Sequence, residues 1–191
     1  MTETSALERK MESREVVIIG SGPAALRAAI ACVDGGTVPL LIDEFGIGSA
    51  SGSHPVAGLA ASIDEIDSKS HEEDTLALGG ETCDEEAVSR TCKQGVETLA
   101  ELERWGLALR RREGGLPHAS AAPGHKTPRL TGCGDSTVRE VTRVLEEQAI
   151  KRGIQRNADS IPLTIVSDNS QVRGLAVSYT HLTLPTKQMV W

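Results

Sequence analysis

Three small residues, Gly20, Gly22 and Ala25, stand at the spacing of a phosphate-binding turn. In such a turn the first glycine permits a tight bend, and the second lets backbone N–H groups approach a pyrophosphate. The small third residue lets the next helix lie close to the sheet. A proline in the first helical turn costs nothing, because its missing N–H would be unpaired there. The candidate binding residues of this turn are Gly20, Ser21, Gly22, Pro23, Ala24 and Ala25.

The segments around this turn fit the same chemistry. Glu15–Ile19 is a short β-branched run that predicts a buried parallel strand, and Ala24–Cys32 predicts a helix of small residues. A second apolar run, Val38–Ile42, ends in the acidic pair Asp43 and Glu44. The pair lies about twenty residues past the glycines, where a carboxylate meets a ribose hydroxyl. This order predicts a Rossmann-like α/β domain with a parallel sheet. The same residues also fit a core in which the glycines only pack.

Composition excludes several classes of function. The chain carries 27 acidic and 20 basic residues and a net charge of −7, which argues against nucleic acid as a partner. No apolar run approaches the length of a membrane span, and residues 1–14 lack the apolar core of a secretory signal, so we expect a disordered leader there. The 4 cysteines form no CxxC pair. We therefore expect reduced thiols in a cytoplasmic protein, with no metal site and no iron–sulfur cluster on this chain.

The middle of the chain combines a glycine-rich segment, a polar segment and a helix. Phe45–Ala61 is nearly uncharged and rich in Gly and Ser, which suits backbone running close to a ligand. Ser62–Asp74 is acidic and polar, and we expect a surface excursion without chemistry of its own. Asp84–Trp105 has apolar residues at helical spacing and predicts a helix with a break at Gly95 and an end at Gly106.

Three further segments precede the end of the chain. Pro117–Gly134 is a loop rich in Pro, Gly and His. Asp135 predicts the N-cap of a helix over Ser136–Arg152. Ile161–Ala176 predicts a β-hairpin with Asp168–Asn169 in its turn.

The final residues, Val177–Trp191, do not follow the pattern of the preceding chain. They hold two of its four aromatic residues, Tyr179 and Trp191, and their apolar positions follow no period. The run Val177–Thr186 (VSYTHLTLPT) resembles the translation of a transposase adapter used in sequencing libraries. We therefore expect residues 177–191 to be a non-native tail added to a gene cut near Ala176. A genuine β-strand tail is the alternative.

Several motifs follow the glycine turn in a fixed order. They are LRAA at Leu26–Ala29, Asp74–Thr75, Gly79–Gly80, Asp84–Val88, GVETLAELERWGL at Gly95–Leu107, and PGHKTPRLTGCGDSTVR at Pro123–Arg139. In this order the motifs resemble those of the flavoprotein subunits of succinate dehydrogenase and fumarate reductase, with L-aspartate oxidase. The resemblance covers nearly all of Glu15–Ala176. Two departures are Val138, which stands where the family has Gly in D-x-T-G, and the run at Val56–Ala61, which lacks the Gln and one Gly of AQGGIAA.

The resemblance implies FAD at the glycine turn, in an oxidoreductase where a hydride passes between flavin and a dicarboxylate. It also implies that Asp43–Gly58 wraps the flavin side. The candidates that follow the glycine turn are Asp43, Glu44, Ser51, Gly52, Ala57, Gly58 and Asp135. The family's dicarboxylate-binding and proton-delivering residues come mainly from later in the chain, so we assign no catalytic residue here. Residues 15–176 are thus expected to be an incomplete FAD-binding domain, inactive alone.

Histidines and an arginine are candidates for covalent attachment of FAD and for binding of a dicarboxylate. Respiratory members of the family attach FAD covalently through the His of an SHT motif, which Ser53–Pro55 resembles. An ungapped alignment of Asp43 and Gly58 places Ser51 at that position instead, so we expect noncovalent FAD and keep His54 as the alternative. The loop Pro117–Gly134 carries His118, His125 and Arg129. Their side chains could bind the carboxylates of a dicarboxylate, or they could equally satisfy backbone groups in a coil.

The resemblance extends to partners and location. It implies a dicarboxylate substrate, an iron–sulfur partner subunit in the complete complex and a role in electron transport. It also implies a cytoplasmic protein without direct membrane insertion, peripheral to the membrane only through partner subunits. Three alternatives stay open: an L-aspartate oxidase-like enzyme, an unrelated NAD(P)-linked or disulfide-reductase-type flavoenzyme, and a nucleotide-binding module without catalysis. The missing CxxC pair argues against the disulfide-reductase type.

Overall fold

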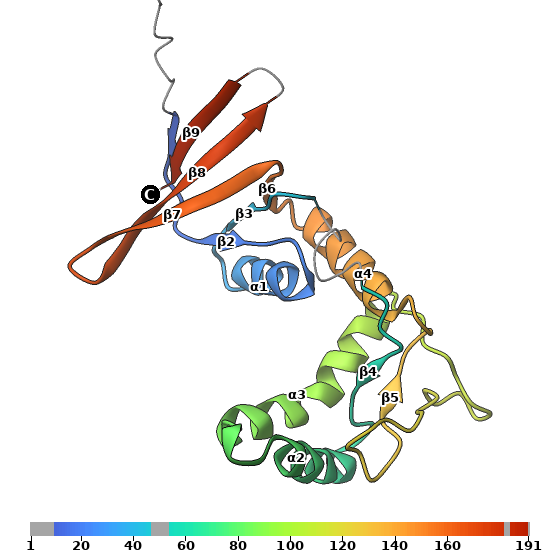
Figure 1. The fold of residues 1–191 in the computed structure, drawn as a ribbon. Helices are drawn as coiled ribbons and strands as arrows, with labels where there is room; N and C mark the ends of the chain where they lie inside the picture. The colour runs from blue at the N-terminus through green and yellow to red at the C-terminus, as the bar shows by residue number, and fades with distance from the viewer. Residues whose placement is uncertain (1–9, 47–53, 182–183, 191) are drawn as a thin grey trace, which may run out of the picture. The chain divides into compact units, whose positions relative to one another are not determined.

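The computed structural model describes residues 10–46, 54–181 and 184–190 (Figure 1). The chain divides into two compact units. Unit 1 comprises Met1–Ser53 and Leu145–Trp191, and unit 2 comprises His54–Val144. Helix α4 (Thr137–Lys151) begins in unit 2 and ends in unit 1.

Unit 1 contains the strand–turn–helix–strand arrangement that the sequence predicts. Strand β2 (Val17–Ile19) leads through the glycine turn into α1 (Pro23–Asp34), and β3 (Leu40–Ile42) follows. Strands β2 and β3 are parallel, with Val17 opposite Leu40. A third parallel strand, β6 (Gln155–Asn157), lies beside β3 and gives the order β2-β3-β6. The α/β fold with a parallel sheet is therefore confirmed.

A second sheet of unit 1 is built around a long hairpin. Strands β7 (Ser160–Asp168) and β8 (Gln171–His181) are antiparallel, and the turn residues Asn169 and Ser170 both have positive φ. This confirms the predicted hairpin, with its turn one residue later than expected. The full order is β1-β9-β8-β7, where β1 is Lys10–Glu12 and β9 is Leu184–Val190.

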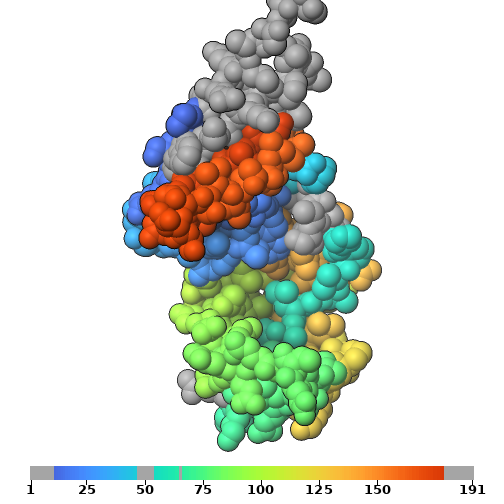
Figure 2. Space-filling view, turned by 60° about the vertical axis from the view of Figure 1, so that its left-hand side comes forward, coloured from blue at the N-terminus to red at the C-terminus, as the bar shows by residue number. Residues whose placement is uncertain are grey.

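The hairpin packs on the parallel sheet through apolar side chains. Leu175 and Val177 of β8 form a buried cluster with Leu40 and Ile42 of β3, and Val17 packs against it. In Figure 2 the orange and red hairpin lies across the blue N-terminal segment of unit 1. The sequence-predicted boundary after Ala176 therefore falls inside β8. Strand β1 lies within the predicted leader, so residues 10–12 are ordered; residues 1–9 are outside the described part.

Unit 2 is built on two long helices and a small sheet. Helix α2 (Glu65–Gly79) is followed by the 3-10 turn η2 (Gly80–Thr82) and by α3 (Glu85–Arg104). Strand β4 (Leu59–Ala60) pairs antiparallel with β5 (Leu130–Thr131).

The polar segment 62–74 differs from its expectation. We predicted a surface excursion over Ser62–Asp74, whereas most of it belongs to α2, whose N-cap Asp64 accepts a hydrogen bond from the Asp67 N–H at 2.8 Å. The prediction was wrong because the positions of α2 that face the interior are polar rather than apolar. Helix α3 matches its prediction at both ends, but it runs unbroken through Gly95.

Within the described ranges of the chain, no helix combines the length and apolar character needed to cross a membrane.

Candidate nucleotide-binding site

The glycine turn joins β2 to α1 in the geometry that its residue types suggest. Gly20 has φ +124, a conformation that favours glycine, and its N–H donates to the Ile42 carbonyl of β3 at 2.8 Å. A Cβ placed on Gly20 would lie 3.5 Å from the Ala25 Cβ, so a small residue at position 25 keeps helix and turn close. Gly22 is the N-cap of α1, and Pro23 begins the helix.

The N-terminus of α1 is suited to an anion. No side chain caps it, and its first turn carries no acidic residue. Backbone N–H groups in the first turn of a helix have no intrahelical partner, and the helix dipole makes this end positive. A pyrophosphate would satisfy both features, so these residues fit a dinucleotide.

Asp43 lies directly after β3, at the same edge of the sheet as the turn. It is buried, and its carboxylate accepts two hydrogen bonds from Arg156 of β6, from Nε at 2.6 Å and from Nη2 at 3.3 Å. The Gly46 N–H donates to the same carboxylate. Ser21 of the glycine turn donates from Oγ to the Gly46 carbonyl at 2.9 Å. Asp43 is thus connected to the turn, whereas Glu44 is exposed.

The remaining predicted site residues fall in two places. Ser51 and Gly52 lie outside the described residues. In unit 2, the backbone around Ala57 and Gly58 runs beside the residues around Asp135, because the Val56 N–H donates to the Asp135 carbonyl at 3.2 Å. The side chain of Asp135 is exposed, and α4 begins at Thr137, so Ser136 rather than Asp135 directly precedes the helix.

Thr137 and Gly132 hold this part of unit 2 together, and the site prediction omitted both. Thr137 is fully buried; its Oγ1 donates to the Gly134 carbonyl at 2.6 Å, and the Ala57 carbonyl lies 3.5 Å from the same hydroxyl. A Cβ on Gly132 would lie 2.3 Å from Thr137 Oγ1 and 3.0 Å from the Gly58 Cα. The D-x-T pattern at Asp135–Thr137 was the sequence signal for Thr137, but the prediction assigned only its Asp to the site. Val138 lies in the helix without positive φ, so the missing glycine of that pattern costs no strain.

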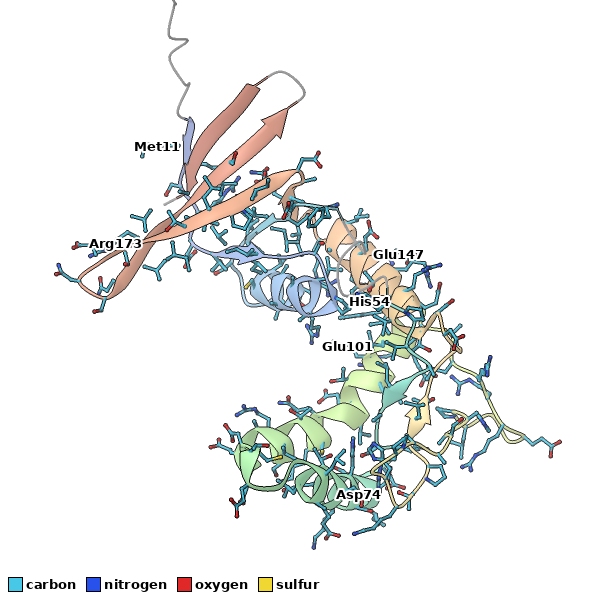
Figure 3. The ribbon with its side chains drawn as sticks, viewed as in Figure 1. Met11, His54, Asp74, Glu101, Glu147 and Arg173 are labelled. Carbon is cyan, nitrogen blue, oxygen red and sulfur yellow. The ribbon has the colours of Figure 1, made fainter. Side chains whose placement is uncertain are left out.

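Arg129 is the most deeply buried charged side chain of unit 2. Its guanidinium donates to Asp67 at 2.9 Å, to Asp74 at 2.6 Å and to Ser70 at 2.8 Å, all on α2. His125 Nδ1 lies 3.1 Å from the same group. Figure 3 labels Asp74 on α2. Arg129 therefore joins the loop before β5 to α2. This differs from both sequence interpretations, substrate binding and a contact with backbone groups.

Two groups around Arg129 have shifted pKa values. A hydrogen bond from the Lys126 N–H, followed by one from Arg129, lowers the pKa of Asp74 below its ordinary 3.8. Burial, followed by the charge of Arg129, lowers the pKa of His71 below its ordinary 6.5. Asp74 therefore stays ionised and His71 stays neutral at neutral pH. His118 is exposed, and its N–H donates to the Arg110 carbonyl at 2.7 Å.

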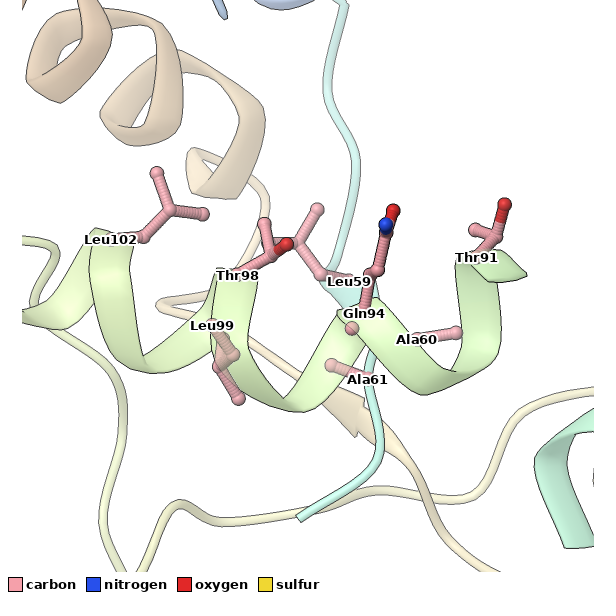
Figure 4. Close-up of a pocket in the computed structure, with 9 residues that line it drawn as sticks. Leu59, Ala60, Ala61, Thr91, Gln94, Thr98, Leu99 and Leu102 are labelled. Carbon is pink, nitrogen blue, oxygen red and sulfur yellow. The ribbon is translucent and has the colours of Figure 1, made fainter. Parts of the chain in front are cut away.

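An apolar pocket of about 250 Å³ lies in unit 2 (Figure 4). Residues of β4, of α3 and Ala61 directly after β4 line it, and none of them is titratable. They are Leu59, Ala60, Ala61, Thr91, Gln94, Gly95, Thr98, Leu99 and Leu102. The pocket offers shape and apolar surface, and its polar side chains are the neutral Thr91, Gln94 and Thr98.

Comparison with known proteins identifies the cofactor of the chain. Residues 15–186 match the family described as "FAD binding domain". The chain belongs to the FAD binding domain family. Its cofactor is therefore FAD, as the motif order predicted. The match continues past Ala176 to residue 186.

Two curated relatives illustrate the likeness in sequence. The chloroplastic L-aspartate oxidase of Arabidopsis thaliana is 33% identical over 137 residues, which cover 71% of this chain and 21% of the relative. A fumarate reductase (CoM/CoB) subunit of Methanothermobacter marburgensis is 31% identical over 180 residues, covering 90% of this chain and 32% of the relative. The chain thus spans between about a fifth and a third of these relatives.

Solved structures share the fold. The Sdh1 complex of Mycobacterium smegmatis in the apo form aligns over 95% of this chain and 33% of its own, with a TM-score of 0.86 and 21% identity. The quinol fumarate reductase of E. coli aligns over 95% of this chain and 32% of its own, with a TM-score of 0.85 and 24% identity. The recognition of the succinate dehydrogenase and fumarate reductase flavoproteins from motif order is confirmed.

Proposed function

We propose that this chain is the FAD-binding part of a flavin-dependent oxidoreductase that acts on a dicarboxylate of the succinate and fumarate type. The observation that carries the proposal is the glycine turn between parallel β2 and α1, with an uncapped helix N-terminus and Asp43 at the neighbouring strand end. The likeness to a fumarate reductase subunit over 90% of the chain supports the substrate class.

The residues of the chain bind and orient the cofactor. The N–H groups at the start of α1 bind the pyrophosphate, and Asp43 accepts a hydrogen bond from the ribose. From the family resemblance, Glu44, Ser51, Gly52, Ala57, Gly58 and Asp135 are candidates for the remaining contacts. Bound FAD would supply a hydride acceptor at N5. No residue of this chain is assigned to the dicarboxylate or to its proton.

An L-aspartate oxidase-like activity is the second candidate. It is favoured by the 33% identity to the Arabidopsis thaliana enzyme, against 31% to the fumarate reductase subunit. The two candidates use the same cofactor and differ in whether the oxidised substrate is an amino acid.

The proposal includes partners and location. We infer a cytoplasmic flavoprotein that passes electrons to a partner with iron–sulfur clusters and reaches a membrane only through its partners. The resemblance to respiratory flavoproteins supports this, and the acidic net charge of −7 gives no reason to expect nucleic acid as a partner.

The activity is tested on the complete flavoprotein encoded at the same locus. Succinate oxidation with an artificial acceptor, fumarate reduction by a reduced dye, and peroxide release from L-aspartate are measured on one preparation. Turnover of succinate or fumarate is the expected result. Turnover of L-aspartate alone would replace the first candidate by the second. Tight FAD binding without turnover of any of the three would contradict both candidates and leave a nucleotide-binding module.

A further inference from the structure

Arg156 and Asp43 form a two-point contact between neighbouring strands of the parallel sheet. Arg156 lies in β6, and Asp43 directly follows β3. Two guanidinium nitrogens reach the two oxygens of one carboxylate, Nε to Oδ2 at 2.6 Å and Nη2 to Oδ1 at 3.3 Å. The Asp43 side chain is 3% exposed and that of Arg156 is 25% exposed. A planar guanidinium in this arrangement fixes the orientation of a carboxylate as well as its charge.

The pair is also tied to the loop beside the glycine turn. The Gly46 N–H donates to Asp43 Oδ1, and the Gly46 carbonyl accepts from Ser21 Oγ. Gly46 has φ +88, and a Cβ there would lie 3.4 Å from Arg156 Nη2. Asp43, Arg156 and the turn thus belong to one hydrogen-bonded group at the edge where a dinucleotide's ribose is expected.

The Asp43 carboxylate has more acceptor sites than its contacts with Arg156 and Gly46 use. A carboxylate has about four lone-pair sites, two on each oxygen. Among residues 10–46, 54–181 and 184–190, Oδ1 receives the Gly46 N–H and Arg156 Nη2, whereas Oδ2 receives only Arg156 Nε. One site on Oδ2 is left for a ribose hydroxyl. The guanidinium also offsets the repulsion between the Asp43 carboxylate and the diphosphate of a nearby dinucleotide.

We propose that Arg156 is a positioning residue of the FAD site, which turns Oδ2 of Asp43 toward the adenosine ribose and neutralises the charge of that carboxylate. This inference rests on the proposed FAD-binding function. It assigns Arg156 a role through Asp43 and no contact with the flavin ring.

The test compares nucleotides that differ by one hydroxyl. FAD, ADP and 2′-deoxy-ADP are titrated into the wild-type chain and into the variants Arg156→Met and Arg156→Lys, with thermal melting of each unliganded protein. Arg156→Met is expected to weaken FAD and ADP by about 10- to 100-fold, as for loss of a charged hydrogen bond. It is expected to bind ADP and 2′-deoxy-ADP nearly equally, whereas the wild type prefers ADP. Arg156→Lys, which keeps the charge, is expected to recover part of the affinity.

Arg152→Met is the matched control. Arg152 makes an equivalent two-point contact with Asp34 at the far end of α1, from Nε at 2.8 Å and from Nη2 at 3.2 Å. Its loss is expected to leave FAD affinity and the preference for ADP unchanged.

Each outcome separates the inference from the function on which it rests. An Arg156→Met variant that keeps the wild-type affinity and preference would overturn the inference and leave FAD binding intact. A wild-type chain that binds neither FAD nor ADP would overturn the proposed function and the inference together. If Arg156→Met does not fold, Arg156→Lys decides by the same preference, and an unchanged preference there overturns the inference.

Discussion

At the scale of single residues, Gly22 separates the needs of the fold from those of the cofactor. Its φ of −77 and ψ of 177 are extended backbone that any residue adopts, so a valine adds no backbone strain there. The side chain would occupy the space in which the pyrophosphate approaches the helix N-terminus. Gly22→Val is therefore expected to weaken FAD binding by about tenfold or more, or about 1.4 kcal/mol, with little change in the melting temperature of the unliganded protein.

Flavin fluorescence titration measures this effect. Ala31→Val, at an exposed position in the last turns of the same helix, is the control and should bind FAD like the wild type. Equal FAD affinity of Gly22→Val and Ala31→Val would show that the phosphate does not approach this turn.

The charges around Arg129 give unit 2 a dependence of stability on pH. The folded-state pKa of His71 lies below 6.5, so below pH 6.5 the unfolded state binds more protons than the folded state. This contribution to stability is present above pH 6.5 and is lost as the pH falls through the lower folded-state pKa. The same sign holds for Asp74, whose contribution is present above pH 3.8 and lost below it.

Urea unfolding of unit 2 at a series of pH values separates the two groups. His71→Gln is expected to flatten the slope just below pH 6.5, and Asp74→Asn is expected to flatten the slope below pH 3.8 while lowering stability at pH 7. Wild-type stability that rises as the pH is lowered from 6.5 would contradict the assignment of a neutral His71.

The types of single residues predicted the glycine turn but not the ion pairs of Arg129. The glycine turn was predicted because Gly20, Gly22 and Ala25 each have one steric reason for their identity. The partners of Arg129 were not predicted, because a buried ion pair joins residues 55 positions apart, and neither partner has a local signal.

At the scale of elements, two glycine substitutions test whether α3 is continuous through Gly95. Gly95 lies in the helix interior, and a Cβ there meets nothing within 4 Å. Gly95→Ala should stabilise the protein by about 0.5–1 kcal/mol, since alanine is the better helix former. Gly106 follows the same helix with φ +107, so Gly106→Ala should destabilise it by a similar or larger amount.

Chemical denaturation of both variants gives the comparison. The free energy of unfolding is expected to rise for Gly95→Ala and to fall for Gly106→Ala, because the two substitutions add the same methyl group to different backbone conformations. Destabilisation by Gly95→Ala would mean that α3 breaks at this position.

The elements differ in how well the sequence predicted them. Strands β2 and β3 have apolar runs. Helix α1 follows the glycine turn and begins at Pro23, and α3 has helical spacing and the N-cap Asp84, so local patterns were enough. Strand β6 reads Gln-Arg-Asn and has no apolar run, so the sequence did not predict it. Its pairing with β3 and the contact of Arg156 with Asp43 place it in the sheet. Helix α2 was missed because Asp67, Ser70 and Asp74 share its inner face at helical spacing, as polar residues.

At the scale of the whole molecule, the chain covers 21% of an L-aspartate oxidase and 32% of a fumarate reductase subunit. The FAD-binding part could therefore be predicted, because its motifs lie within the chain, whereas no residue of the chain is assigned to the substrate. The predicted foreign origin of residues 177–191 is a separate proposal at this scale. A long-read sequence of the source locus is expected to diverge after Ala176, and a read that still encodes Tyr179–Thr186 would contradict the proposal.

The most direct test of the central claim is the cofactor that the purified chain binds. After reconstitution with a mixture of FAD and NAD, gel filtration, absorbance and mass analysis identify the nucleotide and its stoichiometry. We expect one FAD per chain, released into the supernatant by acid; a precipitate that stays yellow would instead favour covalent attachment through His54. A chain that retains NAD, or no nucleotide at all, would contradict the assignment of the glycine turn to FAD.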